Sequence, residues 1–576
     1  MTHSGSAISE MTVNLLFEHF ATLATAPNGI ARLRELILQL AVQGKLGTQD
    51  VGDEPALKLV ERIRKEKERL VKEGTIKKDK PLKISNSEDP PGHLPKTWVW
   101  TRLSEVGLVN PRNYDIADDV DVSFIPMTLI PVGYKKPAQQ EIKKWGEIKA
   151  GFTHFADNDV VMAKITPCFQ NGKSVVLRNL KNGVGAGTTE LHVFRSIKNL
   201  MNPEFVLLFL KTPEFLETGI RRMTGSAGQK RVPNEYFSEI PFPLPPLAEQ
   251  NRIVAKVDRF MTICDELEAQ QQQERAGCLR LGTASLAGLQ NAESPEKFGR
   301  QWVQVCDAFD LILDCPENVK VLRQTILQLA VQGRLVRQEP GDEPADLMIN
   351  RFLKNNPINN KKKINDKKMD IPSKLPRSWA FRTLGSIIYF AGRIGWRGLL
   401  AEEYTLEGPL FFSAHNLSER KYADLSKSYH IPIERYEESP EIQLQNHDIL
   451  LVKDGSGIGK IGLINDLTEK ATINSSLLLI RANEIIDPEF LYFQLGGPGL
   501  QKIVHERITG SATPHLFQKD IKNFSLVIPP IAEQHRIVAK VNALMALCDA
   551  LESRLKERAA IQTKFTDAIV KNVGTG

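Results

Sequence analysis

The chain has 576 residues, 41% of them hydrophobic, and its 75 Lys and Arg exceed its 69 Asp and Glu to give a net charge of +6. This length predicts several domains with ordinary cores, while so slight a basic excess decides little about a partner. No stretch approaches the roughly 18 apolar residues of a membrane span, the N-terminus lacks a secretory signal, and the six cysteines form no CxxC pair, so we expect a cytoplasmic protein with free thiols.

Two copies of one unit of about 285 residues make up the chain. LQLAVQGKL at 38–46 returns as LQLAVQGRL at 327–335, a shift of 289 positions. Further segments return in the same order, namely GDEPA (52–56 and 341–345), LPKTWVWTRL and LPRSWAFRTL (94–103 and 375–384), TGSA (224–227 and 509–512), and PPLAEQNRIVAKV and PPIAEQHRIVAKV (245–257 and 529–541). So long a period excludes a solenoid, in which repeats recur about every 20–50 residues.

Two helices are predicted ahead of the first divergent region. Residues 30–46 carry an apolar stripe at helical spacing, with Gly44 at the expected end. Residues 55–73 form the second helix, which starts at Pro55 and ends before Gly74. The stripe consists of Leu33, Leu36, Ile37, Leu40 and Ala41.

Residues 94–246 and 375–530 are each predicted to form a compact α/β domain. Short β-rich runs such as DVVMAKI alternate with turn residues, and PEFVLLFLKT and PEFLYFQLGG each indicate one helix. Residues 104–157 and 385–446 share almost no sequence, although the segments around them are alike. We interpret the alike parts as performing one structural task twice and the unlike parts as recognising two different things.

A long helix is predicted after each domain. Apolar residues there follow alternating spacings of four and three, which is typical of a coiled coil. They are Ile253, Val257, Phe260, Cys264 and Leu267 in the first copy and Ile537, Val541, Leu544, Cys548, Leu551 and Leu555 in the second. We interpret the two cysteines as small buried apolar residues rather than reactive thiols.

The predicted fold class is therefore α+β, with two α/β domains separated and joined by long coiled-coil helices in a pseudo-two-fold internal repeat. A Lys- and Asn-rich linker is expected at 354–368. The expected parts are an N-terminal helical region (1–93), the first α/β domain (94–246), a central coiled-coil region with the linker (247–374), the second α/β domain (375–530) and a C-terminal coiled-coil helix (531–576).

The doubled order of LQLAVQGxL, LPxxW, divergent domain and PPxAEQxRIVAKV resembles the specificity subunit of type I restriction-modification systems over about residues 30–570. The resemblance implies two target-recognition domains that each read half of a bipartite, asymmetric DNA sequence. It implies conserved helices that fix the separation of the domains and dock two modification (methyltransferase) subunits and the restriction/translocase subunits. It also implies no catalytic site, cofactor or metal in this chain, since S-adenosylmethionine belongs to the modification partners, and ATP and Mg²⁺ to the restriction subunit.

Loops rich in Lys, Arg, Gln, Ser and Thr are the candidate DNA contacts, because these side chains bind phosphates and base edges. Lys164 and Lys453 occupy equivalent positions, as do the two TGSA segments. Any one basic loop residue has the alternative of being a solvated charge, and Trp396 that of a packed aromatic. The candidates are Lys135, Lys136, Lys164, Gln170, Lys173, Ser226, Gln229, Lys230 and Arg231 in the first domain and Arg393, Trp396, Arg397, Lys453, Ser456, Lys460, Ser511, Thr513 and His515 in the second.

Three motifs that suggest an enzyme fail on inspection. GIGKIG at 457–462 is followed by strand-like residues instead of the helix that a dinucleotide site needs. NPRNY at 110–114 has Arg112 where the adenine methyltransferase motif has proline, and the Glu-x-Lys pairs at 141–143 and 147–149 lack a preceding Pro-Asp. Two alternatives remain open: an enzyme with a diverged active site, and a helical assembly scaffold whose variable domains bind protein.

Overall fold

The computed structural model describes residues 20–76, 93–356, 375–392, 399–509 and 515–575, apart from residues 21, 47, 198, 227, 400, 419 and 456. The chain divides into two compact units: unit 1 comprises Met1–Gln273 and Glu557–Gly576, and unit 2 comprises Glu274–Lys556. Each unit holds one α/β domain, and two long helices, α9 (Leu247–Gln290) and α19 (Ile531–Thr575), each cross from one unit into the other. The predicted fold class is confirmed. The five predicted parts are not the same division as these two units, and they remain a prediction.

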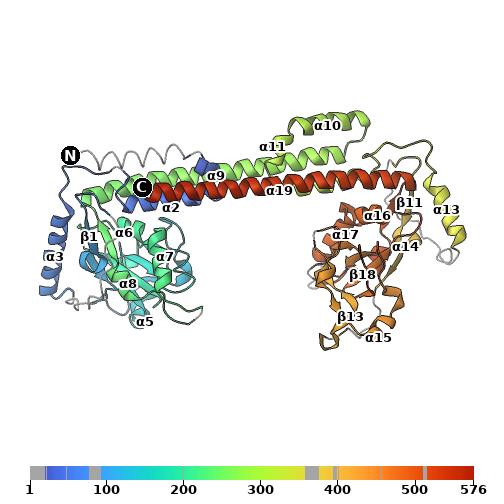
Figure 1. The fold of residues 1–576 in the computed structure, drawn as a ribbon. Helices are drawn as coiled ribbons and strands as arrows, with labels where there is room; N and C mark the ends of the chain where they lie inside the picture. The colour runs from blue at the N-terminus through green and yellow to red at the C-terminus, as the bar shows by residue number, and fades with distance from the viewer. Residues whose placement is uncertain are drawn as a thin grey trace. The chain divides into compact units, whose positions relative to one another are not determined.

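Unit 1 begins with two helices that match the predicted spans. α2 (Gly29–Val42) ends just before Gly44, whose φ of +70° suits a residue without a side chain. α3 (Ala56–Lys72) ends just before Gly74, whose φ is +72°. α2 lies alongside the first part of α9 (Figure 1), and all five residues of the predicted stripe are buried in the core that these helices share.

Domain 1, residues 94–246, contains two four-stranded sheets and a two-stranded ribbon among its described residues. One sheet has the antiparallel order β2-β9-β6-β7, and the other has the order β4-β3-β8-β5, in which β3 and β8 run parallel. The ribbon pairs β1 with β10 and so joins the two ends of the domain. The strands are β1 (Val99–Arg102), β2 (Gly107–Val109), β3 (Asp121–Ile125), β4 (Glu141–Lys144), β5 (Thr153–Ala156), β6 (Val160–Ala163), β7 (Ser174–Val176), β8 (Val184–Gly187), β9 (Leu191–Ser196) and β10 (Pro241–Leu244).

Five α-helices of domain 1 connect these strands: α4 (Leu103–Val106), α5 (Trp145–Ile148), α6 (Pro203–Leu210), α7 (Pro213–Arg222) and α8 (Asn234–Glu239). α6 is the helix predicted from PEFVLLFLKT, and residues Phe205 to Leu210 are all buried in it. Its N-cap residue Asn202 accepts a hydrogen bond from the backbone N–H of Glu204, which explains why the helix starts there.

Domain 2, residues 375–530, repeats this topology with different residues. Its sheet order β12-β18-β15-β16 corresponds to β2-β9-β6-β7, its parallel pair β13–β17 to β3–β8, and its ribbon β11–β19 to β1–β10. The strands are β11 (Ala380–Thr383), β12 (Tyr389–Ala391), β13 (Thr405–Phe412), β14 (Tyr429–His430), β15 (Ile449–Val452), β16 (Ile461–Leu463), β17 (Ala471–Ile473), β18 (Leu477–Arg481) and β19 (Ser525–Ile528).

The helices of unit 2 other than the long ones are α10 (Pro295–Asp307), α11 (Phe309–Leu313), α12 (Glu317–Val331), α13 (Ala345–Asn355), α14 (Leu384–Ile387), α15 (Ile433–Glu437), α16 (Pro488–Gly496), α17 (Pro498–Thr509) and α18 (Gln518–Lys522). α12 carries the second LAVQG segment and is the counterpart of α2. Taken over both units, no helix in the described part of the chain combines the length and the apolar character that a membrane span requires.

The predicted heptad positions lie in the same hydrophobic clusters as the LAVQG helix of their own unit. Ile253, Val257 and Cys264 lie in one cluster with α2, and Ile537 and Val541 lie in one cluster with α12. Matching ion pairs flank the two contacts, Arg34 with Asp265 (2.5 Å) and Glu268 (2.8 Å), and Arg323 with Asp549 (2.6 Å) and Glu552 (3.3 Å). Burial raises the pKa of Cys264 to about 11, which keeps its thiol protonated, as the sequence interpretation required.

Replacement of two glycines of α9 by alanine should change the stability of the chain in opposite directions. A Cβ at Gly282 would stand 2.4 Å from the amide nitrogen of Asn318, a fully buried side chain that donates to the carbonyl of Ile312 (2.7 Å). A Cβ at Gly277 would meet no atom within 4 Å. We expect Gly282→Ala to destabilise unit 2 by about 2 kcal/mol because a buried hydrogen bond is displaced, and Gly277→Ala to stabilise the helix by about 0.5–1 kcal/mol. Thermal unfolding of the full chain measures both; a Gly282→Ala midpoint at or above that of the unmodified chain would contradict this packing.

Candidate nucleic-acid interface

Three segments of domain 1 that are far apart in sequence form one surface. The backbone N–H of Val232 donates to the carbonyl of Lys164 (2.8 Å), and that of Thr166 donates to the carbonyl of Lys230 (2.9 Å). Thr224 and Arg231 exchange backbone hydrogen bonds of 3.0 and 2.8 Å, which close the TGSA segment into a loop. Lys164, the loop at 166–173 and the loop at 224–231 therefore meet; the sequence analysis named candidates in all three without predicting that they come together.

Polar side chains beneath this surface contact backbone carbonyl groups of its loops and of neighbouring segments. His192 on β9 lies within 3.0 Å of the carbonyl of Val232 and stacks on Phe237. Lys211, at the end of α6, donates to the carbonyl of Gly172 (2.8 Å), and burial lowers its pKa to about 7. Lys173 donates to the carbonyl of Met127 (3.0 Å), so its ammonium group is partly engaged in holding its own loop.

The cations of this surface differ in how far they are neutralised. Arg231 forms a bidentate pair with Glu190 through distances of 2.8 and 2.9 Å, and this pair lowers the pKa of the Glu190 carboxyl. Among the residues that the structure describes, no carboxylate forms an ion pair with Lys164 or Lys230, and Lys230 is exposed. These two ammonium groups are therefore available to phosphate, and the exposed side chains beside them offer polar groups to base edges, namely Gln170, Ser226 and Gln229.

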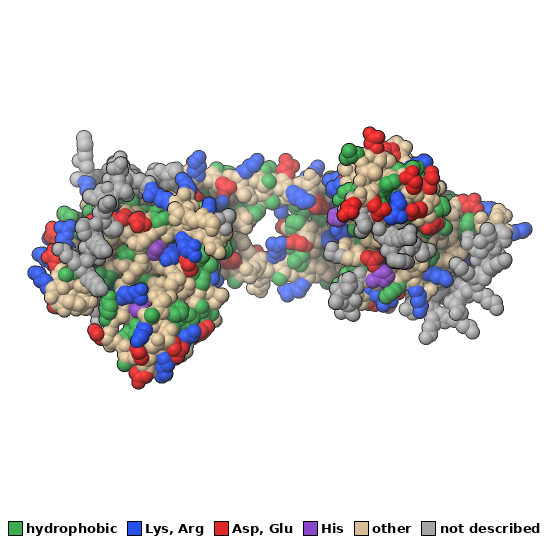
Figure 2. All heavy atoms as spheres, turned by 90° about the horizontal axis from the view of Figure 1, so that it is seen from below, with side chains coloured by type: hydrophobic (Ala, Val, Ile, Leu, Met, Phe, Trp, Pro, Cys, Tyr) green, Lys and Arg blue, Asp and Glu red, His purple; other side chains and the backbone are tan. Residues whose placement is uncertain are grey.

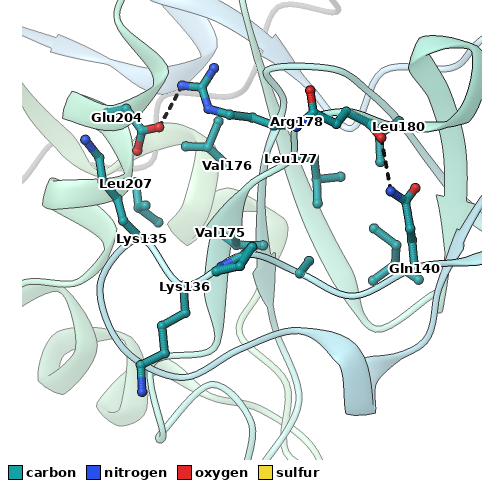
Figure 3. Close-up of a pocket in the computed structure, with 14 residues that line it drawn as sticks. Lys135, Lys136, Gln140, Val175, Val176, Leu177, Arg178, Leu180, Glu204 and Leu207 are labelled. Carbon is teal, nitrogen blue, oxygen red and sulfur yellow. Dashed lines mark hydrogen bonds and ion pairs between the residues drawn. The ribbon is translucent and has the colours of Figure 1, made fainter.

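Lys135 and Lys136 lie on another loop of domain 1, beside a cavity of about 460 Å³ (Figure 3). The ammonium group of Lys135 pairs with Asp258 of α9 (2.6 Å), and the hydroxyl of Tyr134 donates to the other oxygen of the same carboxylate (2.8 Å). The two lysines extend in opposite directions from the loop, and Arg178 pairs with Glu204 (2.7 Å) at the rim. The structure thus uses Lys135 to fasten domain 1 to the long helix.

The same fastening occurs in unit 2 at the equivalent helix position. Lys421 donates to Asn542 of α19 (3.1 Å) and pairs with Glu489 (2.6 Å). Asn542 directly follows the second VAKV segment, as Asp258 follows the first. The sequence analysis missed Asp258 and Asn542; a polar residue at one position of both repeats was the signal that could have found them.

Domain 2 builds its surface with the same backbone bonds. The N–H of Leu516 donates to the carbonyl of Lys453 (2.9 Å), as Val232 does to Lys164, and the N–H of Lys453 donates to Ser476 (2.9 Å). His515 contacts the carboxylate of Asp454, which also lies 3.4 Å from the ammonium group of Lys453, while Lys460 is exposed. The other predicted contacts of this domain lie outside the described residues: Arg393, Trp396, Arg397, Ser456, Ser511 and Thr513.

Basic and acidic side chains are interspersed on the visible face of each unit (Figure 2). This mixture agrees with a net charge of only +6 in 576 residues. Binding of a polyanion would then depend on a few free cations at particular loops instead of on a uniformly basic face.

Acidification should weaken domain 1 through His192. Burial lowers the pKa of this histidine to about 4, so the folded state keeps it neutral while the unfolded chain protonates it below about pH 6.5. Because the unfolded state then binds more protons, stability falls as the pH drops from 6.5 toward 4, by about 2 kcal/mol between pH 7.5 and pH 5. His192→Gln should reduce this loss in thermal unfolding at the two pH values. A pH dependence as large in His192→Gln as in the unmodified chain would contradict the assignment.

Known proteins that resemble this chain in sequence and in fold come from type I restriction-modification systems. The family model described as the type I restriction modification DNA specificity domain matches residues 95–275 and 414–560. The specificity subunit of the type I restriction enzyme EcoEI from Escherichia coli is 36% identical over 561 residues, which cover 94% of this chain and 93% of that subunit. The EcoAI specificity subunit from the same organism is 37% identical over 563 residues, with the same coverages of 94% and 93%. A solved chain from a structural study of a type I restriction-modification system aligns with a TM-score of 0.50 at 18% identity and covers 84% of this chain and 99% of that chain.

Proposed function

Because the chain belongs to the family of type I restriction-modification specificity subunits, we propose that it selects the DNA sequence on which such a complex acts. Membership of this family implies a non-catalytic role. In the proposal, domain 1 and domain 2 each read one half of a bipartite, asymmetric target. One match to the specificity-domain model in each copy of the repeat supports this assignment.

The observation that carries the proposal is the pair of surfaces built on the same backbone framework. The bonds from Val232 to Lys164 and from Leu516 to Lys453 recur with nearly equal lengths of 2.8 and 2.9 Å. The side chains on that framework differ, since Arg231 pairs with Glu190 in domain 1 whereas His515 contacts Asp454 in domain 2. One framework that presents two sets of side chains is what reading two different half-sites requires.

In this proposal lysine ammonium groups bind phosphates and the neighbouring amides contact bases. Lys164 and Lys230 would hold the DNA backbone in domain 1, with Lys453 and Lys460 in domain 2, while Gln170 and Gln229 would reach base edges. The remaining candidate residues from the sequence analysis stay predictions. Lys135 is the weakest of them, because Asp258 already neutralises its charge.

We also propose the partners and the location that the family resemblance suggested. Two copies of the helical frame favour two modification subunits per chain, together with restriction/translocase subunits, in the cytoplasm. S-adenosylmethionine would bind in the modification subunits, and ATP and Mg²⁺ in the restriction subunit. Methylation of an adenine requires that the base leave the stack, and this step would take place in the partner's pocket.

Mapping of methylated bases tests the proposal. DNA from cells that express this chain with its neighbouring modification subunit would be sequenced by a long-read method and compared with DNA from cells that lack the chain. A new bipartite methyl-adenine motif is expected only when the chain is present. Absence of any motif beside an active modification subunit would overturn the proposal and favour the assembly scaffold, which would bind DNA with little salt dependence. Methyl transfer by the purified chain alone would point to an enzyme instead.

A further inference from the structure

A buried glutamate stands at the start of each long helix. Glu249 and Glu533 come from the two AEQ segments, each is the third residue of its helix, and the side chains of both are fully buried. Burial raises the pKa of each carboxyl, and the hydrogen bonds that each accepts oppose this rise. A buried carboxylate costs several kcal/mol unless its oxygens are well bonded, so its partners define what it does.

The partners of Glu249 come from two other segments of the chain. Its carboxylate accepts hydrogen bonds from the indole N–H of Trp98 (2.8 Å), the amide of Gln49 (3.0 Å) and the hydroxyl of Thr48 (3.1 Å). Trp98 is the tryptophan of the LPxxW segment that opens domain 1, while Gln49 follows α2 and also donates to the carbonyl of Gly44 (2.6 Å). One carboxylate thus ties the domain, the LAVQG helix and the long helix together.

Unit 2 repeats the arrangement at equivalent residues. Glu533 accepts from the indole N–H of Trp379 (3.0 Å) and from the amide of Gln338 (3.0 Å), and Gln338 also donates to the carbonyl of Gly333 (2.8 Å). Next to each glutamate an arginine of the long helix pairs with the aspartate of a GDEPA segment, Arg252 with Asp53 and Arg536 with Asp342.

The glutamine that follows each glutamate forms hydrogen bonds with a second segment of the domain. Gln250 accepts from the backbone N–H of Asn202 (2.9 Å), which caps α6, and donates to the carbonyl of Pro245 (3.0 Å). Gln534 does the same with Asp487 (2.8 Å), which caps α16, and with Pro529 (2.9 Å). Two separated attachment points leave only rotation about the line between them. The contacts of Lys135 with Asp258 and of Lys421 with Asn542 supply a third point, so each domain is held at a set angle on its helix.

We propose that Glu249 and Glu533 are positioning residues that set the orientation of each recognition domain on its long helix and thereby the DNA spacing that the chain accepts. This inference rests on the proposed function. Neither residue touches DNA in the proposal; each acts through the tryptophan and glutamine that it holds. Packing alone could be supplied by apolar residues of similar volume, since a buried charged group is often replaceable without loss of stability. Directional bonds between each carboxylate and two other segments explain why carboxylates stand at these positions.

The test is methylated-base mapping with Glu249→Gln and Glu533→Gln in the full chain, co-expressed with the modification subunit. Glutamine has nearly the volume of glutamate, but an N–H₂ group replaces one of the two acceptor oxygens. At least one of the hydrogen bonds that the carboxylate accepts is therefore lost. We expect methylation at sites whose spacer is one base pair longer or shorter, relative to authentic sites, to rise about tenfold, the factor for one lost charged hydrogen bond. Trp98→Phe and Trp379→Phe keep a ring but remove the N–H, and should give the same relaxation.

Asp159→Asn is the matched control for a merely structural effect. Asp159 is a buried carboxylate that pairs with Arg195 inside domain 1 (2.7 Å), and among the described residues it makes no hydrogen bond or ion pair with a long helix. Its loss should lower total methylation without relaxing the spacing. An unchanged spacing ratio in both glutamine variants, or the same relaxation in Asp159→Asn, would overturn the positioning role. Failure of the unmodified chain to produce any motif would instead overturn the proposed function.

Discussion

Insertion of four residues into both long helices is expected to lengthen the spacer of the recognised DNA sequence by about two base pairs. Four residues add about 6 Å to a helix at 1.5 Å per residue, and successive base pairs rise about 3.4 Å. Methylated-base mapping should then show the same two half-sites with a longer gap and loss of modification at the original sites. This is a change of specificity and not of activity, since the recognition loops are untouched.

The structure gives the positions for this insertion. The boundary between the two units falls after Gln273 in α9 and after Lys556 in α19, so an insertion at each point lengthens both connections equally. Four residues exceed one turn of 3.6 residues by about 40°, so the half-sites should also be read with a small rotational offset. Replacement of the four residues before each point by alanines, with the heptad residue Leu555 kept, is the control and should keep the original spacer. A spacer that stayed unchanged after the double insertion would contradict a frame made by the helices.

The doubled architecture could be predicted from sequence because its signals are local. The apolar stripe from Leu33 to Ala41 and the glycines at 44 and 74 define α2 and α3, and PEF after a capping residue starts α6 and α16. Each of these depends on residues within one or two turns. The repeat then supplies the second copy of the elements in the alike segments, such as α12, α16 and α19.

The contacts that hold the domains on the helices could not be predicted in this way. Trp98 meets Glu249 across 151 positions, and nothing in either segment alone indicates that an indole N–H and a carboxylate will meet. The heptad of α9 predicted a helical partner, yet its residues also face a domain, because apolar spacing shows that a face is buried and not what covers it. The parallel pairing of β3 with β8 likewise depends on tertiary packing.

The candidate DNA contacts stay predictions, and their charge state could not be predicted from the sequence. Lys164 and the TGSA segment were each singled out by recurrence in both copies, and the backbone bonds of Val232 and Arg231 bring the two together in domain 1. Which cations remain free depends on acidic neighbours that lie far away in sequence. Glu190 pairs with Arg231, and Asp258 pairs with Lys135. The sequence made these two cations as good candidates as Lys230, but in the structure a carboxylate already neutralises each of them.

Replacement of Lys164 and Lys230, the two lysines that pair with no carboxylate among the described residues, is expected to cause a large loss of DNA affinity. Lys164→Ala combined with Lys230→Glu removes the two cations of domain 1 that are proposed to bind phosphate and adds one repulsive charge. Alanine is chosen at Lys164 because the site is half-buried near Glu190, where a second carboxylate would disturb the fold. We expect binding of the complex to target DNA to weaken at least about 30-fold at physiological salt, and the slope of log affinity against log salt to fall by about 1.8, since each phosphate contact contributes about 0.9.

The matched variant separates local contact from general charge. Lys58→Ala with Lys65→Glu changes the net charge equally on the exposed face of α3, in the same unit. If the proposed surface binds phosphate, this variant should keep its affinity and its salt slope within about twofold, because a charge more than a Debye length of about 8 Å from the DNA is largely screened. Equal losses in the two variants would mean that affinity follows overall charge, and the assignment of Lys164 and Lys230 as phosphate contacts would fail. A loss confined to the first variant, with thermal unfolding unchanged, leaves removal of direct contacts as its cause.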